Sequence, residues 1–441
     1  MTLQVFQWSA LGETERRAVL ARPTHDLPQL DAVVSEIAED VRKNGDEALY
    51  RYTKKFDGIT LDRLAVTADE FAEAHEAMGE PARAALSRAV DNVRRFHLAQ
   101  RTLPLSMETS PGMRCERVEV PIRAVGLYVP AGSAPLPSTA IMNAVPAEIM
   151  GCPTRVLCTP PRPDGRADAA VLVVAKMCGI DKVFKVGGVQ AIAAMAYGTE
   201  SVPKVDKVFG PGNAWVTAAK LLVSRDPDGA ALDLPAGPSE VLVIADASSR
   251  PRFLAADLLA QAEHDPRAHV MLVCTSQEIV QQTLGEVERQ MSTLARREVA
   301  ALALRQSRVV LVDDLASAIE VANAYAPEHL MICVQNARAW LPQVRAAGSV
   351  FLGPWTPEPL GDYCSGPNHV LPTYGYARAY SGLSLADFGR RMTVQEASPE
   401  ALKDLGPVAQ TLAGLEGLGA HANAVQVRLE ALAAEAEASV P

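Results

Sequence analysis

The sequence of 441 residues contains no run of about 20 apolar residues, the length that a membrane-spanning helix requires. Its first segment, Met1–Arg17, also lacks the basic start and apolar core of a secretion signal. Basic residues are in deficit, since 42 Lys and Arg oppose 52 Asp and Glu. The net charge of −10 argues against nucleic acid or an anionic membrane as a partner, because both bind to basic surfaces.

Paired cysteines are missing as well. The seven cysteines are scattered and show no CxxC spacing, which favours reduced thiols in a cytoplasmic protein over a disulfide framework or a cysteine-type zinc site. Covalent oxidation of an aldehyde would need a reactive thiol. None of Cys115, Cys152 and Cys364 has an arrangement of neighbours that clearly lowers the pKa of its thiol, so we interpret them as small apolar residues.

The order of the expected elements predicts an α/β fold with more than one domain, since a chain of this length exceeds one ordinary core. The first part of the chain is expected to be helical, most clearly at 30–43 and 82–99, and a last helix is expected at 425–439. Between them, β-branched runs alternate with helical stretches, which predicts parallel sheets with helices on their faces, in two sheet domains. These runs are 155–158, 170–175, 183–186, 241–245, 270–274, 309–312, 330–334 and 349–352.

Proline and glycine cluster at 128–137, 209–213 and 235–238, which predicts sharp turns and candidate crossings between domains. The GxGxxG fingerprint of dinucleotide binding is missing. Gly187–Gly188 follows an expected strand and opens a helix, and Gly210–Gly212 forms another glycine turn. Such turns either hold a pyrophosphate at a helix N-terminus or serve only as turns.

Gln261 and His264 form the first part of a candidate metal site. They lie three residues apart in a helix expected to start near Ser249 and Pro251. Residues at this spacing share a helix face, so the two side chains can meet at one ion. The alternative is a helix that simply ends in polar residues.

Further candidate ligands lie towards the C-terminus. Asp362 and His369 belong to the long polar stretch 361–377, whose tyrosines favour an ordered functional loop. His421 follows Glu416 by five residues. One Gln, one Asp and histidines form a set of nitrogen and oxygen donors that favours Zn²⁺ or a similar ion over Ca²⁺ or Mg²⁺, although residues so widely spaced do not prove a site.

Glu328–His329 is the candidate acid–base pair. It lies between a helix expected at 315–324, which Pro327 stops, and the strand expected from Leu330. Turns into strands commonly carry reactive groups in α/β folds. Imidazole exchanges protons near neutral pH, and the carboxylate can activate water. A helix cap beside a partly buried histidine is the alternative.

Longer motifs resemble the histidinol dehydrogenase family over nearly the full chain. The resemblance implies two incomplete Rossmann-like α/β domains, of the type shared by aldehyde and histidinol dehydrogenases, with small helical extensions at both termini. The matching segments are 126–139, 186–194, 200–217, 236–246, 262–264, 325–330, 348–355, 361–377 and 391–396.

The resemblance also implies a division of the chain. Residues 1–24 would form an N-terminal helical extension, 25–127 and 239–380 an α/β domain with the zinc and catalytic residues, 128–238 a second α/β domain that contacts NAD, and 381–441 a C-terminal extension that reaches a partner subunit. The expected assembly is a homodimer with shared active sites.

The family's activity is the NAD-dependent oxidation of L-histidinol through L-histidinal to L-histidine, the last steps of histidine biosynthesis, with one zinc ion per subunit that positions the substrate. By resemblance, His329 is the general base and Glu328 activates water. The implied zinc ligands are Gln261, His264, Asp362 and His421, all of which also belong to the substrate site with His329. The other implied substrate contacts are Ser239, His369 and Glu416, and the implied NAD contacts are Tyr128, Gln190 and Asn213.

Three other functions compete with this one. A related enzyme on the same scaffold would oxidise another small alcohol, and the presence of His369 and Glu416 argues for histidinol. A cysteine-dependent aldehyde dehydrogenase would be sensitive to thiol reagents and would not need zinc. A non-catalytic metal-binding protein would bind zinc without reducing NAD, and the Glu328–His329 pair argues against it.

Overall fold

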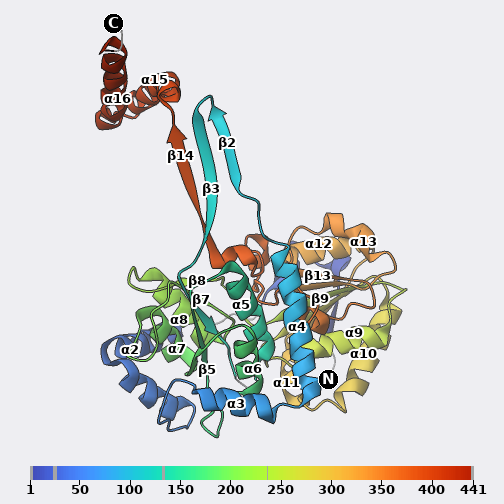
Figure 1. Cartoon of the computed structure of the whole chain (residues 1–441). Helices are drawn as coiled ribbons and strands as arrows, with labels where there is room; N and C mark the ends of the chain where they lie inside the picture. Colours follow the sequence, from blue (N-terminus) through green and yellow to red (C-terminus); the bar gives the residue numbers. More distant parts are fainter. Residues whose placement is uncertain (1–2, 23–26, 132–134, 236, 439–441) are drawn as a thin grey trace. The chain divides into compact units, whose positions relative to one another are not determined.

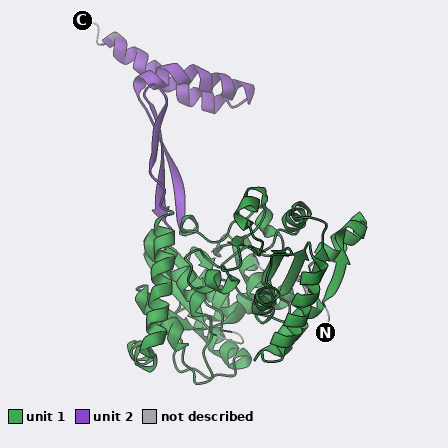
Figure 2. Ribbon diagram, turned by 90° about the vertical axis from the view of Figure 1, so that its right-hand side faces the viewer, with its two compact units in different colours: residues 1–100, 122–388 green, residues 101–121, 389–441 purple. Residues whose placement is uncertain are grey.

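The computed structural model describes residues 3–22, 27–131, 135–235 and 237–438. The chain forms two compact units, Met1–Gln100 with Ile122–Phe388 and Arg101–Pro121 with Gly389–Pro441 (Figure 2). The first unit contains two parallel sheets covered by helices, and the second contains an antiparallel sheet and a helix pair (Figure 1). The predicted α/β fold with two parallel sheets is confirmed.

One parallel sheet has the strand order β6-β5-β4-β7-β8. The chain enters at β4 in the centre, adds strands towards one edge and then continues on the other side of β4. The order therefore reverses between β4 and β7, and the carboxyl ends at such a switch point are where α/β sheets bind ligands. The strands are β4 (Ala124–Tyr128), β5 (Thr154–Thr159), β6 (Lys182–Lys185), β7 (Lys207–Phe209) and β8 (Ala231–Leu232).

Helices cover both faces of this sheet because its side chains alternate between two apolar cores. Val125 and Leu127 contribute to the core under α5 and α6, which α3 and α4 cover in turn. Ala124 and Tyr128 contribute to the core under α7 and α8, against which α2 packs. The helices are α2 (Leu27–Phe56), α3 (Ala68–Ala77), α4 (Glu80–Leu98), α5 (Pro137–Met150), α6 (Ala169–Met177), α7 (Gly188–Tyr197) and α8 (Ala214–Arg225).

The helices expected at 30–43 and 82–99 are confirmed within α2 and α4. Both pack on helices of the β4–β8 sheet, whereas the predicted division joined residues 25–127 to the other sheet. The domain boundaries stay predictions, and the one between residues 24 and 25 lies outside the described part of the chain.

The strand predicted at 170–175 is wrong, because these residues belong to helix α6. Asp168 caps this helix, and its side chain accepts hydrogen bonds from the N–H groups of Ala170 (2.9 Å) and Val171. Val171 to Ala175 are buried. A short run that is apolar on every side has no periodicity that separates a strand from a buried helix, and only the capping aspartate distinguishes them.

The second parallel sheet repeats the topology of the first. Its order is β1-β11-β10-β9-β12-β13, so β9 takes the central place of β4 and the order reverses between β9 and β12. The N-terminal strand β1 pairs with β11 and extends one edge. The strands are β1 (Gln4–Gln7), β9 (Glu240–Ala245), β10 (His269–Cys274), β11 (Arg308–Leu311), β12 (His329–Ile332) and β13 (Ser349–Leu352).

Two groups of helices cover this second sheet. The core on one face contains side chains of α9, α10 and α11, and the core on the other contains side chains of α1, α12 and α13. These helices are α1 (Glu13–Leu20), α9 (Pro251–Ala262), α10 (Gln277–Met291), α11 (Arg297–Arg305), α12 (Leu315–Tyr325) and α13 (Ala337–Trp340). The unit also contains α14 (Glu358–Tyr363) and the 3₁₀ turns η1 (Trp8–Ala10), η2 (Leu341–Gln343), η3 (Tyr376–Arg378) and η4 (Leu385–Phe388).

The second unit is an antiparallel sheet of order β14-β3-β2 followed by two packed helices. Gly406 lets the helices approach closely, because an added Cβ there would lie 3.1 Å from Val425 and 3.2 Å from Leu429. The expected helix 425–439 is confirmed up to residue 438, and Ser439 lies outside the described residues. The elements are β2 (Leu105–Ser110), β3 (Met113–Pro121), β14 (Gly389–Ala397), α15 (Pro399–Leu415) and α16 (Gly419–Ala438).

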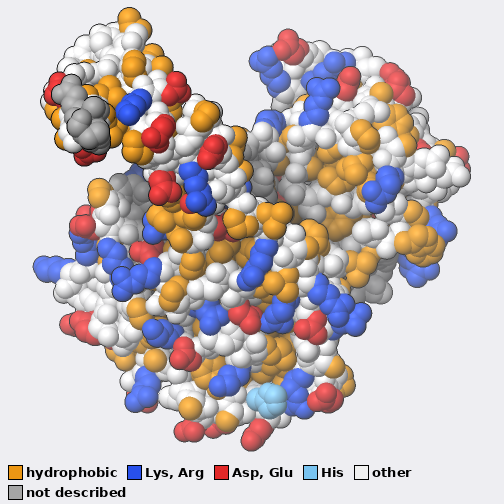
Figure 3. Space-filling model, turned by 45° about the horizontal axis from the view of Figure 1, so that its top comes forward, with side chains coloured by type: hydrophobic (Ala, Val, Ile, Leu, Met, Phe, Trp, Pro, Cys, Tyr) orange, Lys and Arg blue, Asp and Glu red, His pale blue; other side chains and the backbone are white. Residues whose placement is uncertain are grey.

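Apolar side chains are exposed in this second unit. Met392, Val394, Leu412 and Leu415 are all exposed, and Leu415 has 81% of its surface accessible. Figure 3 shows apolar side chains interspersed with charged residues of both signs on one face of the molecule. Across the described residues, none of the helices combines the length and hydropathy that crossing a membrane requires.

Phe388 is expected to be important for the stability of the first unit. Its ring is fully buried and stacks on Phe209, with centroids 4.0 Å apart. We predict that Phe388→Ala lowers the free energy of unfolding by about 3–5 kcal/mol, because it leaves a cavity. Urea denaturation measures this change. Phe388→Leu, which refills part of the space, should cost less, and equal costs for both variants would contradict the packing argument.

Candidate active site

Glu328 and His329 lie at the amino ends of the strands of the second parallel sheet. Helix α12 ends at Tyr325, Ala326 adopts a left-handed conformation (φ 53°), and Pro327 prevents the helix from continuing. His329 is the first residue of β12 and pairs with β9 and β13. The expected position of the pair at the turn into a strand is confirmed.

The backbone of Glu240, the first residue of β9, contacts both members of the pair. Its N–H donates a hydrogen bond to Glu328 Oε2 (2.7 Å), and its carbonyl oxygen accepts one from His329 Nδ1 (3.0 Å). A carbonyl oxygen only accepts, so Nδ1 carries a hydrogen. His329 Nε2 has no hydrogen-bond partner in the described part of the chain and lies 3.6 Å from Asp362 Oδ1. In a neutral ring, Nε2 is therefore the nitrogen available as a base.

Gln261 and His264 lie at the end of α9, as expected. The helix stops at Ala262, and the N–H of His264 still donates to the carbonyl of Gln261 (3.2 Å). The Gln261 amide is completely buried, yet neither its oxygen nor its nitrogen has a partner among the described residues. A buried amide without a partner costs roughly 1–3 kcal/mol. This orphaned group indicates a ligand that is not part of the chain.

Helix α14 brings two acids to the same place. Glu358 and Asp362 are four residues apart, so they share one face of the helix. Ligand atoms of His264, Glu358 and Asp362 lie within 4.8 Å of one another. Both carboxylate oxygens of Glu358 are buried without a hydrogen-bond partner in the described structure. Sequence reasoning missed Glu358, and its spacing from Asp362 was the available signal.

The electrostatics of this cluster favour a bound cation. Burial alone would lower the pKa of His329, but the nearby Glu328, Glu358 and Asp362 hold it well above its usual value. Burial raises the pKa of Glu328 and of Glu358 to about 8 each. With such raised pKa values the two glutamates stay largely protonated near neutral pH, and their ionised forms would leave an excess of negative charge that a divalent ion would offset. The donor set and the orphaned amide therefore fit a metal ion.

The remaining predicted substrate residues divide between the two units. His369 lies in the first unit, where its Nδ1 donates to the carbonyl of Asp362 (2.7 Å) and its Nε2 lies 3.3 Å from Thr139 Oγ1. Ser239 directly precedes Glu240. Glu416 and His421 belong to the second unit and are exposed in it. The first unit thus brings most of the predicted site together, and the roles of Glu416 and His421 stay predictions.

The residues predicted to contact NAD lie at the carboxyl ends of the β4–β8 sheet. The hydroxyl of Tyr128, the last residue of β4, accepts a hydrogen bond from the N–H of Gly188 (3.0 Å) in the first turn of α7. Gln190 is buried in the same helix. Asn213 caps α8, and its side chain accepts from the N–H groups of Trp215 (3.1 Å) and Val216 (3.2 Å).

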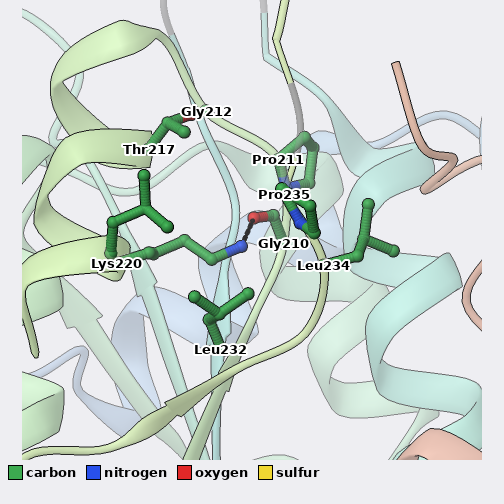
Figure 4. Close-up of a pocket in the computed structure, with 9 residues that line it drawn as sticks. Gly210, Pro211, Gly212, Thr217, Lys220, Leu232, Leu234 and Pro235 are labelled. Carbon is green, nitrogen blue, oxygen red and sulfur yellow. Dashed lines mark hydrogen bonds between the residues drawn. The ribbon is translucent and has the colours of Figure 1, made fainter. Parts of the chain in front are cut away.

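The loop after β7 approaches β4 closely. Gly210 has φ 117°, and an added Cβ would lie 2.1 Å from the carbonyl oxygen of Tyr128, so only glycine fits there. Lys220 also contacts this loop. Its Nζ donates to the carbonyl of Gly210 (2.9 Å) beside a small pocket (Figure 4), and it also pairs with Asp233. Both glycine turns therefore lie near the switch point of the sheet.

The cysteines behave as apolar residues where they are buried. All seven are free thiols. Burial raises the pKa of Cys152 to about 11, and that of Cys178 and Cys333 to about 12, so these thiols stay protonated near neutral pH. Cys364 lies just after α14, and its carbonyl accepts a hydrogen bond from Asn92 Nδ2 (2.8 Å).

Comparison with known proteins identifies the family. Residues 20–429 match the family model described as histidinol dehydrogenase. The chain belongs to the histidinol dehydrogenase family. It is 52% identical to a histidinol dehydrogenase of Vibrio vulnificus (strain YJ016), over 97% of this chain and 98% of that one. It is 51% identical to one of Xanthomonas campestris pv. campestris (strain 8004), over 97% and 99%.

A solved structure supports the same assignment. The chain resembles the crystal structure of histidinol dehydrogenase from Elizabethkingia anophelis with a TM-score of 0.94 and 42% identity, over 98% of each chain. The resemblance stated from the sequence is thus confirmed, and so is the fold that it implied.

The acid cluster leads to a prediction about metal binding. Asp362→Asn and His264→Asn should each weaken binding of a divalent metal by at least about 100-fold, because even residues that only orient a ligand contribute 10- to 100-fold. Competition with a chelator, with metal analysis, measures the affinity. Glu263→Gln, next to His264 but outside the cluster, is the control. Wild-type affinity in Asp362→Asn would rule out this site.

Proposed function

We propose that the chain catalyses the NAD-dependent oxidation of L-histidinol through L-histidinal to L-histidine, the last steps of histidine biosynthesis. Membership of the histidinol dehydrogenase family supports this substrate. The observation that carries the proposal is His329, whose Nδ1–H is held by a backbone carbonyl while Nε2 is left without a partner among the described residues, close to the candidate metal ligands.

Gln261, His264 and Asp362 would hold zinc, together with His421 of a second subunit. The buried Gln261 amide and the crowded acids support the fit. When bound, zinc would orient the amino and imidazole nitrogens of histidinol and so fix the hydroxymethyl group in place. Ser239, His369 and Glu416 would contact the substrate as well.

Tyr128, Gln190 and Asn213 would hold NAD at the switch point of the β4–β8 sheet. The support is the first turn of α7, whose N-cap residue Gly187 makes no side-chain cap, and the close approach that Gly210 permits. When bound, NAD accepts the hydride in each of the two oxidations.

The chain's own residues then move the protons. His329 Nε2 takes the hydroxyl proton of histidinol in the first oxidation. Glu328 takes a proton from the water that adds to histidinal, and protonated His329 returns its proton to the carbonyl oxygen, which gives the hydrate and restores His329 as a base. His329 takes a proton from this hydrate in the second oxidation, and histidine leaves. The two side chains lie next to each other, with His329 Nδ1 3.6 Å from Glu328 Oε2.

A homodimer with shared active sites completes this proposal. Its support is the exposed apolar side chains of the second unit, which a partner subunit would cover. His421 and Glu416 are exposed in that unit and available to a partner. A cytoplasmic location stays a prediction that rests on the cysteine pattern.

The direct test is an assay of NADH formation with L-histidinol. We expect two NADH per histidine formed, loss of activity after treatment with a chelator, and recovery when Zn²⁺ is added. Other small alcohols should react much more slowly than L-histidinol. Thiol reagents should leave the activity unchanged as long as the enzyme keeps its zinc. Equal activity with another alcohol would point to the related-enzyme alternative, and zinc binding without NADH would point to a non-catalytic protein.

His329→Asn should lower kcat by about 10²–10⁴-fold, the usual contribution of a general base. The asparagine amide cannot accept the proton, which accounts for the loss of activity. Its N–H can still donate to the Glu240 carbonyl as His329 Nδ1 does, so the site should keep its shape and the metal content should stay at the wild-type level. Kinetics and metal analysis on the same sample measure both. His75→Asn, an exposed residue of α3, is the control. If His329→Asn loses its metal, His329 is a ligand rather than the base.

A further inference from the structure

We propose that Arg22 and Glu240 form a positioning device for the catalytic pair, one that fixes the tautomer and orientation of His329. This inference rests on the proposed function, because it assigns Glu328 and His329 as the pair that is positioned. Glu240 acts through its backbone, and Arg22 acts through Glu240 and the turn before Glu328.

Glu240 is the first residue of β9 and lies at the amino ends of the strands, where β9 pairs with β12. Its N–H donates to Glu328 Oε2 and its carbonyl accepts from His329 Nδ1, so one peptide segment contacts both catalytic side chains. Any shift of this segment along β9 would move both hydrogen bonds together. The direction of the His329 ring therefore depends on how firmly residue 240 is held.

The side chain of Glu240 is held from two sides. Arg22 Nε contacts Oε1 at 2.5 Å and Nη2 contacts Oε2 at 2.8 Å, which is a bidentate pair. The N–H of Tyr374 donates to Oε1 as well (2.9 Å). The exposed fractions of the Arg22 and Glu240 side chains are only 10% and 3%. Bidentate guanidinium–carboxylate pairs fix geometry in a way that lysine does not reproduce.

Arg22 also holds the other side of the site. Its Nη2 donates to the carbonyl oxygens of Tyr325 (2.9 Å) and Ala326 (3.2 Å), and its guanidinium lies 3.8 Å from the centre of the Tyr325 ring. Ala326 has the left-handed φ of 53°, which is unfavourable for a residue with a Cβ and persists only where surrounding contacts hold it. Arg22 thus joins the start of β9 to the turn that leads into Glu328 and His329.

A contribution to stability alone explains the buried Arg22–Glu240 ion pair poorly. Removing two charges from water costs much of what their attraction returns, so a buried ion pair is poor evidence of stability. The pair instead connects the two backbone segments that carry the contacts of Glu328 and His329, and small displacements of catalytic groups reduce rates strongly.

Arg22→Lys, Glu240→Gln and the double variant test this inference in the full-length enzyme. We expect each single variant to lower kcat for histidinol about 10- to 100-fold, with KM changed less than about threefold and metal content unchanged. The double variant should be no slower than the worse single variant, because the two residues act as one unit. Glu148→Gln, which breaks the Arg94–Glu148 ion pair between α4 and α5, is the control and should keep the wild-type kcat.

A spectroscopic signal provides a readout that does not depend on activity. With ¹⁵N-labelled histidine, the Nδ1–H signal of His329, assigned by its loss in His329→Asn, should be present in the wild type and shifted or broadened in Arg22→Lys and Glu240→Gln. If either variant fails to fold, Glu240→Asp, which keeps the charge, replaces it in the same measurement.

The outcomes separate the inference from the proposed function. Wild-type kcat and an unchanged Nδ1–H signal in Arg22→Lys and Glu240→Gln would overturn the positioning role, even if the enzyme oxidises histidinol. A kcat loss that follows loss of metal or of folded protein would also overturn it. If the wild type does not oxidise histidinol, the proposed function fails, and the Nδ1–H signal still decides whether Arg22 and Glu240 orient His329.

Discussion

The burial of three carboxylates around one imidazole is the constraint on which the site depends. Glu328, Glu358 and Asp362 all lie close to His329, and burial raises the pKa of the two glutamates to about 8. Burying ionised carboxylates costs free energy unless positive charge compensates them, and within the chain His329 supplies only part of that compensation. The buried amide of Gln261, three residues before His264, also has no hydrogen-bond partner in the described structure. A cation bound between the end of α9 and helix α14 would explain both features together.

The two parallel sheets carry their predicted site residues at opposite ends of their strands. In the β4–β8 sheet, the predicted NAD residues lie at the carboxyl ends, where helix N-termini offer N–H groups. In the sheet centred on β9, the acid–base pair lies at the amino ends, beside the C-terminal end of α9. A helix that follows a parallel strand runs back towards the start of that strand, so its last residues arrive at the amino edge. This geometry explains why Gln261 and His264 lie near His329.

Much of this was predictable from local sequence. The helices of α2, α4 and α12, seven of the eight expected strands and the glycine turn that opens α7 follow from periodicity and from proline and glycine positions. The strand predicted at 170–175 was wrong because an evenly apolar run carries no period. The strands β2, β3 and β14 were not predicted, since β2 and β14 are largely exposed, β3 is mostly half-buried, and none of the three has a buried apolar face. Their pairing joins residues near 115 to residues near 395, and no local pattern encodes such a distance.

The sequence by itself determined the chemistry of the candidate residues. It predicted Glu328–His329 as an acid–base pair and Gln261, His264 and Asp362 as nitrogen and oxygen donors, because these chemical properties belong to the side chains. Only the tertiary structure decided which groups meet. It brought Glu358 into the cluster, left the Gln261 amide without a partner among the described residues, and set Glu240 and Arg22 against the catalytic pair. The hydrogen bonds of Glu240 join residues 88 to 218 positions apart in the sequence, so they form only once the chain has folded.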